Sequence, residues 1–218
     1  MKKFAVLLLA LLLVLPLTVH ADKPLSGGWT PAEDYTVTEE RQAVFDKGMV
    51  VSSGEYTAVA YLGSQVVAGT NHVFLRRSAD PLSYDLVYLY EDLEGYVKIL
   101  NVVPVPIVPQ EDGTLTVPEA ELMGGWYYAD DPAVTEEIQA RLDKALDGLV
   151  GATYVPVANL GEQVVAGLNR CLLCQVTPVV PDAQPHYALV YVYEDLQGGA
   201  ELLQTIDLDV GSLCTYGA

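Results

Sequence analysis

The chain is poor in basic residues. Its 218 residues include 11 lysines and arginines against 29 aspartates and glutamates, which gives a formal net charge of -18. A protein that binds nucleic acid needs a basic face to displace counterions from phosphates, and this chain has too few cations to build one. The same shortage excludes a polybasic anchor for anionic lipids. Hydrophobic residues make up 51% of the chain, which excludes disorder and leaves a folded acidic protein.

Histidine and cysteine are also scarce, with three of each. No nucleophile, base and orienting group can be assembled around His72 or His186, so we expect neither an enzyme nor a cofactor. Cys171 and Cys174 have CxxC spacing, but they lie in a predicted strand, where residues three apart point to opposite faces. We therefore expect no metal site. Cys214 can form a disulfide with either of the two, and the sequence leaves the pairing open.

Residues 1–21 have the pattern of an export signal. Lys2 and Lys3 precede an apolar run, and the small residues Val19 and Ala21 fit a signal-peptidase site. The run is short for a membrane span, so we expect cleavage after Ala21 and a secreted protein without a membrane anchor. An uncleaved amino-terminal anchor is the alternative. The short basic start is typical of bacterial export.

The remaining residues contain one sequence unit twice. This predicts two homologous domains, residues 22–109 and 110–218, with a proline-rich linker at the end of the first. Five motifs recur in the same order: GGW (27–29 and 124–126), TEE (38–40 and 135–137), DK (46–47 and 143–144), QVVAG (65–69 and 163–167) and YEDL (90–93 and 193–196).

Each unit shows a helix pattern followed by strand patterns. In the second unit Asp131 is the expected N-cap and Pro132 the first helical residue of an apolar stripe over residues 134–149. Short connections between the predicted strands favour antiparallel hairpins. The pattern predicts an α+β protein of two domains, each with one helix packed on a four- to five-stranded antiparallel sheet. The predicted strands are residues 56–62, 71–77, 85–91 and 96–103, then 152–160, 168–176, 186–194 and 200–209.

The sequence QVVAGTN, residues 65–71, resembles the QxVxG loop of the cystatins, and in particular of their stefin branch. A glycine pair ahead of the helix and the order of helix and strands also resemble that family. The Leu93–Gly95 stretch stands where stefins have a Leu-Pro-Gly second hairpin. The Pro-Trp pair of many cystatins is absent from both copies.

The resemblance implies reversible inhibition of papain-like cysteine proteases by a monomeric protein that occludes the active-site cleft. It implies a three-part wedge in each domain, made of the glycine segment, the QVVAG hairpin and the second hairpin. The first wedge would be Gly27, Gly28, Gln65, Val66, Val67, Ala68, Gly69, Leu93 and Gly95. The second would be Gly124, Gly125, Gln163, Val164, Val165, Ala166, Gly167, Leu196 and Gly198.

Residue chemistry is consistent with this role. Valine and alanine offer small apolar side chains at a hairpin tip, and Gly69 and Gly167 can adopt the positive φ of a tight turn. The acidic residues beside the second hairpin would favour a basic protease over an acidic one. The alternative is a binding or structural module without inhibitory activity. Trp29 and Trp126 are expected to fold back on their own helices, with interface anchoring as the alternative.

Overall fold

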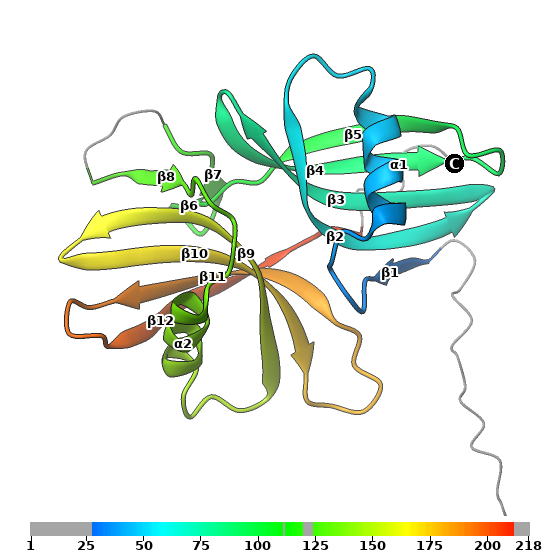
Figure 1. Ribbon diagram of the computed structural model, residues 1–218. Helices are drawn as coiled ribbons and strands as arrows, with labels where there is room; N and C mark the ends of the chain where they lie inside the picture. Colours follow the sequence, from blue (N-terminus) through cyan, green and yellow to red (C-terminus); the bar gives the residue numbers. More distant parts are fainter. Residues whose placement is uncertain (1–27, 111, 120–123, 212–218) are drawn as a thin grey trace, which may run out of the picture.

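The computed structural model describes residues 28–110, 112–119 and 124–211. The predicted signal peptide, Gly27 and Cys214 lie outside the described residues. The described residues form twelve strands and two helices, arranged in two five-stranded sheets and one two-stranded sheet (Figure 1). We call residues 28–104 the first half and residues 124–211 the second half.

The two halves have the same antiparallel topology. The first sheet has the order β1-β2-β3-β4-β5 and the second the order β12-β11-β10-β9-β8. The first half consists of β1 (Trp29–Pro31), α1 (Glu39–Met49), β2 (Tyr56–Val67), β3 (Gly69–Ala79), β4 (Leu82–Glu91) and β5 (Val97–Pro104). The second consists of β8 (Trp126–Tyr128), α2 (Glu136–Ala145), β9 (Ala152–Val165), β10 (Gly167–Pro178), β11 (His186–Glu194) and β12 (Ala200–Leu208). Between them, β6 (Val108–Pro109) pairs with β7 (Leu115–Thr116).

The repeated TEE motif starts each helix. The side-chain oxygen of Thr38 accepts a hydrogen bond from the backbone N–H of Arg41, and Thr135 does the same for Ile138. The two glutamates that follow each threonine lie in the first turn, where negative charge stabilises a helix. The prediction that Asp131 caps α2 is therefore wrong. Its carboxylate accepts a hydrogen bond from the N–H of Ala133 in the loop before the helix.

Each helix packs on the outer face of its own sheet. Phe45 of α1 packs on Phe74 and Leu89 of its sheet in one cluster, and Leu142 of α2 packs on Val190 of its sheet in another. Gly48 of α1 is buried directly against Leu89, where a Cβ would meet the leucine side chain. The close packing against Leu89 therefore explains why a glycine stands at this position of the helix.

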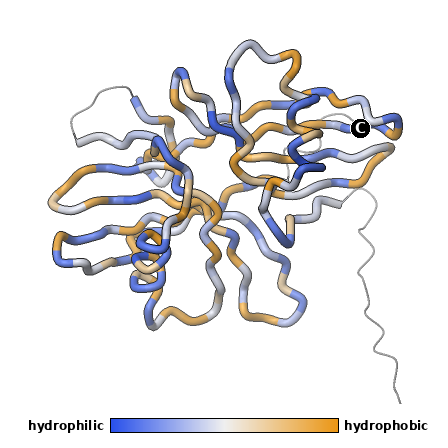
Figure 2. The backbone as a smooth tube through the Cα atoms, viewed as in Figure 1, coloured by the Kyte–Doolittle hydropathy of each residue, from blue (hydrophilic) through white to orange (hydrophobic). Residues whose placement is uncertain are grey.

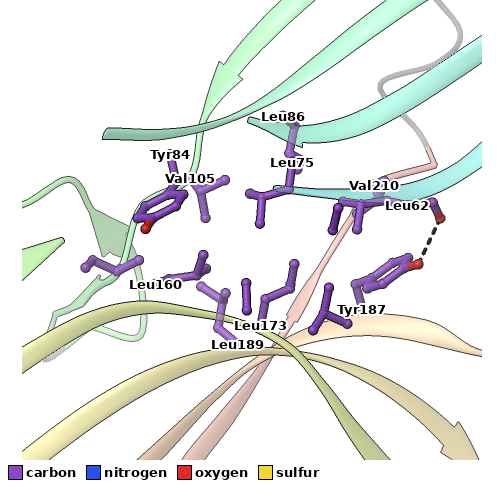
Figure 3. Packing of buried hydrophobic residues seen from close by; sticks show 14 of the residues in the cluster. Leu62, Leu75, Tyr84, Leu86, Val105, Leu160, Leu173, Tyr187, Leu189 and Val210 are labelled. Atoms are coloured by element: carbon purple, nitrogen blue, oxygen red, sulfur yellow. Dashed lines mark hydrogen bonds between the residues drawn. The ribbon is translucent and has the colours of Figure 1, made fainter. Parts of the chain in front are cut away.

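The inner faces of the two sheets share one hydrophobic core. Figure 3 shows Leu62, Leu75 and Leu86 of the first half pointing toward Leu173 and Leu189 of the second. In Figure 2, hydrophobic stretches of both sheets meet where their strands cross near the centre of the molecule. Each of these five leucines is at most 1% exposed. Both faces of the long central strands are consequently buried, one under a helix and one against the other half.

Hydrogen bonds from buried tyrosines join the two halves. Tyr84 and Tyr88 of β4 donate to the carbonyl oxygens of Ala129 and Val210, at 2.8 and 3.0 Å. The residues at the same repeat positions in β11 also reach across. Tyr187 donates to Leu62 at 2.9 Å, drawn in Figure 3, and Tyr191 donates to Ile107, in the segment joining the halves, at 3.1 Å. A buried carbonyl left without a donor is costly, so these bonds fix how the sheets stack.

The predicted fold class is wrong. The chain is mainly β, with sheets of five, two and five strands among the described residues, and it is not two cystatin-like α+β domains. The physical reason is the shared core: the sheets pack face to face rather than each standing alone with its helix. Trp126 lies in this core and meets the ring of Tyr191 edge-on at 5.4 Å. Trp29 packs against the same core, so the expectation that both tryptophans fold back on their own helices is also wrong.

Candidate functional site

Three segments meet at one end of each sheet. In the first half the strand register pairs Trp29 with Gln65, Val67 with Gly69, and Glu91 with both Thr70 and Val97. This places the start of β1, the β2–β3 hairpin and the β4–β5 turn side by side. The register of the second half is equivalent, with Trp126 paired to Gln163 and Glu194 paired to both Leu168 and Ala200. The first tip is Gly28, Gln65–Gly69 and Leu93–Gly95; the second tip is Gly124, Gly125, Gln163–Gly167 and Leu196–Gly198.

Both tips expose apolar side chains. Val66 is 40% exposed and Leu93 is 87% exposed in the first tip. Their counterparts Val164 and Leu196 are 59% and 81% exposed. Hydrophobic side chains elsewhere in the same strands are buried, so the exposure is confined to the tips. An apolar surface left open at the same place in both copies is typical of a contact surface for another molecule.

The QVVAG hairpins are held rigidly. The hydroxyl of Tyr90 donates to the carbonyl of Ala68 at 2.5 Å, and Tyr193 donates to Ala166 at 2.7 Å. At the base of each hairpin an asparagine amide donates to the glutamine side chain of the motif at 2.8 Å: Asn71 to Gln65 and Asn169 to Gln163. The glutamine of QxVxG therefore braces the hairpin internally.

The final glycine of each motif is required by geometry. Gly69 has a φ of 129° and Gly167 a φ of 137°, both in the region that favours glycine. A Cβ at either position would also collide with a backbone carbonyl oxygen, that of Glu91 or of Glu194. The hairpin can lie this close to the neighbouring strand only because the residue has no side chain.

The second turn of each tip is fixed by an aspartate and a lysine. Asp92 accepts hydrogen bonds from the N–H groups of Glu94 and Tyr96, and Asp195 accepts from Gln197 and Gly199. The repeated DK motif supplies the lysines from the ends of the helices: Lys47 donates to the Gly95 carbonyl at 3.1 Å and Lys144 to the Gly198 carbonyl at 2.8 Å. Part of the acidic charge beside the second hairpin thus builds the turn itself.

The glycine segment joins the second tip through a direct bond. The Gln163 amide donates to the carbonyl of Gly124 at 2.9 Å. Gly124 is exposed and has a φ of 74°. In the first tip Gly28 is half-buried beside β1, and Gly27 lies outside the described residues. The structure therefore brings together all the described residues predicted for each wedge.

The two tips rest on different charged groups. Beneath the first tip His72 is largely buried, with Nδ1 at 3.1 Å from the Tyr61 hydroxyl and Nε2 at 3.4 Å from a carboxylate oxygen of Glu91. The corresponding residue beneath the second tip is Arg170. Its Nε donates to Glu194 at 2.7 Å, and its Nη1 pairs with Glu162. His72 can gain a positive charge when the pH falls, whereas Arg170 is permanently charged.

Acidification is expected to weaken the first half through His72. Burial lowers the pKa of His72 below 6.5, an effect that Glu91 opposes and Arg41 reinforces. As the pH falls through 6.5 the unfolded chain therefore binds a proton that the folded chain resists, and the free energy of unfolding decreases. The urea midpoint should fall between pH 7.5 and pH 5 by more in the wild type than in His72→Gln. Equal falls in both proteins would contradict this role.

Cys171 and Cys174 point to opposite faces of β10, as the strand geometry predicts. Cys171 lies in the shared core and Cys174 in the cluster beneath α2, and neither forms a disulfide with a described residue. Burial raises the pKa of Cys171 to about 12 and that of Cys174 further. Among residues 28–110, 112–119 and 124–211 there is no group of three or more acidic, histidine or cysteine side chains that could hold a metal.

Two features of the site were missed by the sequence reasoning. One is the bond from Tyr90 and Tyr193 to the hairpin tips, and the other is the lysine that ties each helix to the second turn. Both sets recur in the repeats, as part of YEDL and of DK, so the signal was present in the sequence. Only the register of the sheet shows which atoms those residues reach.

Comparison with known proteins adds no further assignment. No family model matches the chain, and a search of curated proteins finds no match either. Within the described part of the chain, neither helix has the length and apolar character needed to cross a membrane.

Proposed function

We propose that this protein is a reversible inhibitor of papain-like cysteine proteases and that its tips enter the active-site cleft of the enzyme. The observation that carries the proposal is the convergence of glycine segment, QVVAG hairpin and second turn at one sheet end, with exposed valines and leucine, in both halves. The protease class comes from the resemblance of QVVAG to the cystatin loop. The proposal does not depend on a cystatin fold.

The architecture of a tip suits occlusion of a cleft. The hairpin is narrow, apolar and braced by side-chain bonds, so little conformational entropy is lost when it inserts. The contact surface consists of valine, alanine and leucine side chains, and the mechanism needs no covalent bond. A rigid apolar wedge of this kind blocks a substrate cleft by filling it.

Charge bears on the choice of enzyme. The chain carries a net charge of -18, and Glu94 projects into solvent at the first tip. Opposite charge accelerates association between proteins, and like charge disfavours it. We therefore propose a target protease with a basic surface around its cleft. We also propose that the protein acts outside the cell that makes it, from the export pattern of residues 1–21.

Inhibition of papain by the double variant Val66→Glu/Val164→Glu tests this function. A charge at the centre of each apolar tip must be desolvated on insertion, so we expect the inhibition constant to rise about 30-fold or more, the effect of losing about 2 kcal/mol at a hot spot. Both positions are exposed, so the substitutions leave the fold intact.

The matched control places the same charges elsewhere. Val51 and Val179 are 80% and 70% exposed and lie in loops at the sheet ends away from the tips. The variant Val51→Glu/Val179→Glu should inhibit like the wild type. Absence of inhibition by the wild type at micromolar concentration, against both papain and a cathepsin, would overturn the proposal in favour of a non-inhibitory binding module.

A further inference from the structure

We infer that one molecule of this protein binds two protease molecules at the same time, one at each tip. The inference rests on the function proposed above and extends it to stoichiometry. Its basis is the position of the tips on the folded chain. In Figure 1 the hairpin β2–β3 points to the right-hand side of the molecule and the hairpin β9–β10 to the left-hand side.

The long strands separate the two tips. β2 has 12 residues and β9 has 14, and a strand rises about 3.3 Å per residue, so each sheet is of the order of 40 Å long. A protease domain of about 200 residues has a radius of gyration of roughly 16 Å. Two such bodies approaching opposite ends of the stacked sheets have room to bind without contact.

The shared core fixes this arrangement. The tyrosine bonds to Val210 and Leu62 hold the inner faces of the sheets against each other, and Leu75 and Leu173 fill the space between them. The halves are therefore not modules on a flexible linker that could fold back onto one enzyme. A rigid body with two outward tips presents two separate sites.

The tips are ready for binding in this packed state. Val66, Val164, Leu93 and Leu196 are all at least 40% exposed while the inner faces are buried. A protease can therefore occupy either tip without opening the core. Since the braces of each hairpin come from its own half, occupancy of one tip leaves the supports of the other in place.

Native mass spectrometry of the full chain with excess papain tests the inference. The papain is inactivated as a mixed disulfide of its catalytic thiol with methanethiol, which prevents cleavage of the inhibitor. Papain is kept below the dissociation constant that a substituted tip retains after its loss of affinity. Under that condition we expect two papain molecules per chain for the wild type and one for Val66→Glu or Val164→Glu alone. The double variant should bind none, and the control Val51→Glu/Val179→Glu should bind two.

The outcomes separate this inference from the function on which it rests. A wild type that binds a single papain overturns the two-site inference and leaves inhibition standing. In that case one single variant that abolishes binding identifies the only active tip. Two single variants that each still bind one papain would instead show that the tips exclude each other. A wild type that binds no papain overturns the proposed function itself. Circular dichroism of each variant checks that the fold is retained.

Discussion

Separated from each other, residues 22–109 and residues 110–218 are each expected to fail to fold as a monomer. Each fragment would expose the inner face of its sheet, including Leu75 and Tyr88 in the first and Leu173 and Tyr191 in the second. A buried leucine contributes roughly 1.5–3 kcal/mol relative to an exposed one. Losing several of them removes a free energy of the same order as the roughly 5–15 kcal/mol of a typical folded domain. Thermal melting and sedimentation of each fragment, alone and after mixing, measure the effect.

The full chain cut near Gly113 is the control. This glycine lies in the exposed turn between β6 and β7, and a nick there leaves every inner-face contact intact. The nicked protein should stay assembled and melt cooperatively. A monomeric fragment with its own cooperative transition would contradict the prediction.

A fragment that associates with itself would agree with the prediction. The contacts between the halves are nearly symmetric: Tyr88 reaches Val210 from one side, and Tyr191 reaches Ile107 from the other. These residues occupy equivalent repeat positions, as in an isologous dimer. Two copies of one half could therefore cover each other's inner face, and sedimentation would report a dimer rather than a folded monomer.

The sequence predicted the local hairpins and turns better than it predicted how the two sheets pack against each other. The repeat, the antiparallel hairpins and the need for glycine at residues 69 and 167 all follow from patterns of one or two strands. The β4 sequence shows what was missed. Leu86 and Tyr88 share one face of the strand, as alternation along a strand requires, and that face packs on the other half, while Val87 and Leu89 face the helix. The uninterrupted hydrophobic run over residues 86–90 is typical of burial on both sides.

The start of α2 was missed for a different reason. Asp131 and Pro132 satisfy the local chemistry of a helix start, and Thr135 satisfies it equally well. The choice is made by tertiary contacts: the carbonyl of Pro132 accepts a hydrogen bond from the N–H of Asn159 in β9, which holds this segment against the sheet before the helix begins. Local helix propensity cannot predict this hydrogen bond, because its donor lies in a strand 27 residues further along the chain.

Raising the pH above about 10 is expected to unfold the whole protein in one step. Burial raises the pKa of Tyr84 to about 12, and it raises the pKa values of Tyr128, Tyr187 and Tyr191 further. In the unfolded chain these tyrosines ionise near pH 10. Above that pH the unfolded state releases protons that the folded state keeps, so the free energy of unfolding falls as the pH rises. Each tyrosine accounts for up to about 1.4 kcal/mol per pH unit.

Four such groups act on one shared core, so the loss by pH 12 is of the same order as the roughly 5–15 kcal/mol that holds a typical domain together. A cooperative loss of circular dichroism between pH 10 and 12 should therefore coincide with a step in phenolate absorbance from these four tyrosines. The variant Tyr191→Phe distinguishes the effect of ionisation from that of packing, because it removes the ionisable hydroxyl and keeps the aromatic ring. It leaves the Ile107 carbonyl without its donor and costs about 1–3 kcal/mol at neutral pH, yet its stability should decline less steeply above pH 10. Complete ionisation of all the tyrosines by pH 12 in a protein whose circular dichroism stays constant would contradict the prediction, because the inner-face tyrosines would then ionise without opening the core.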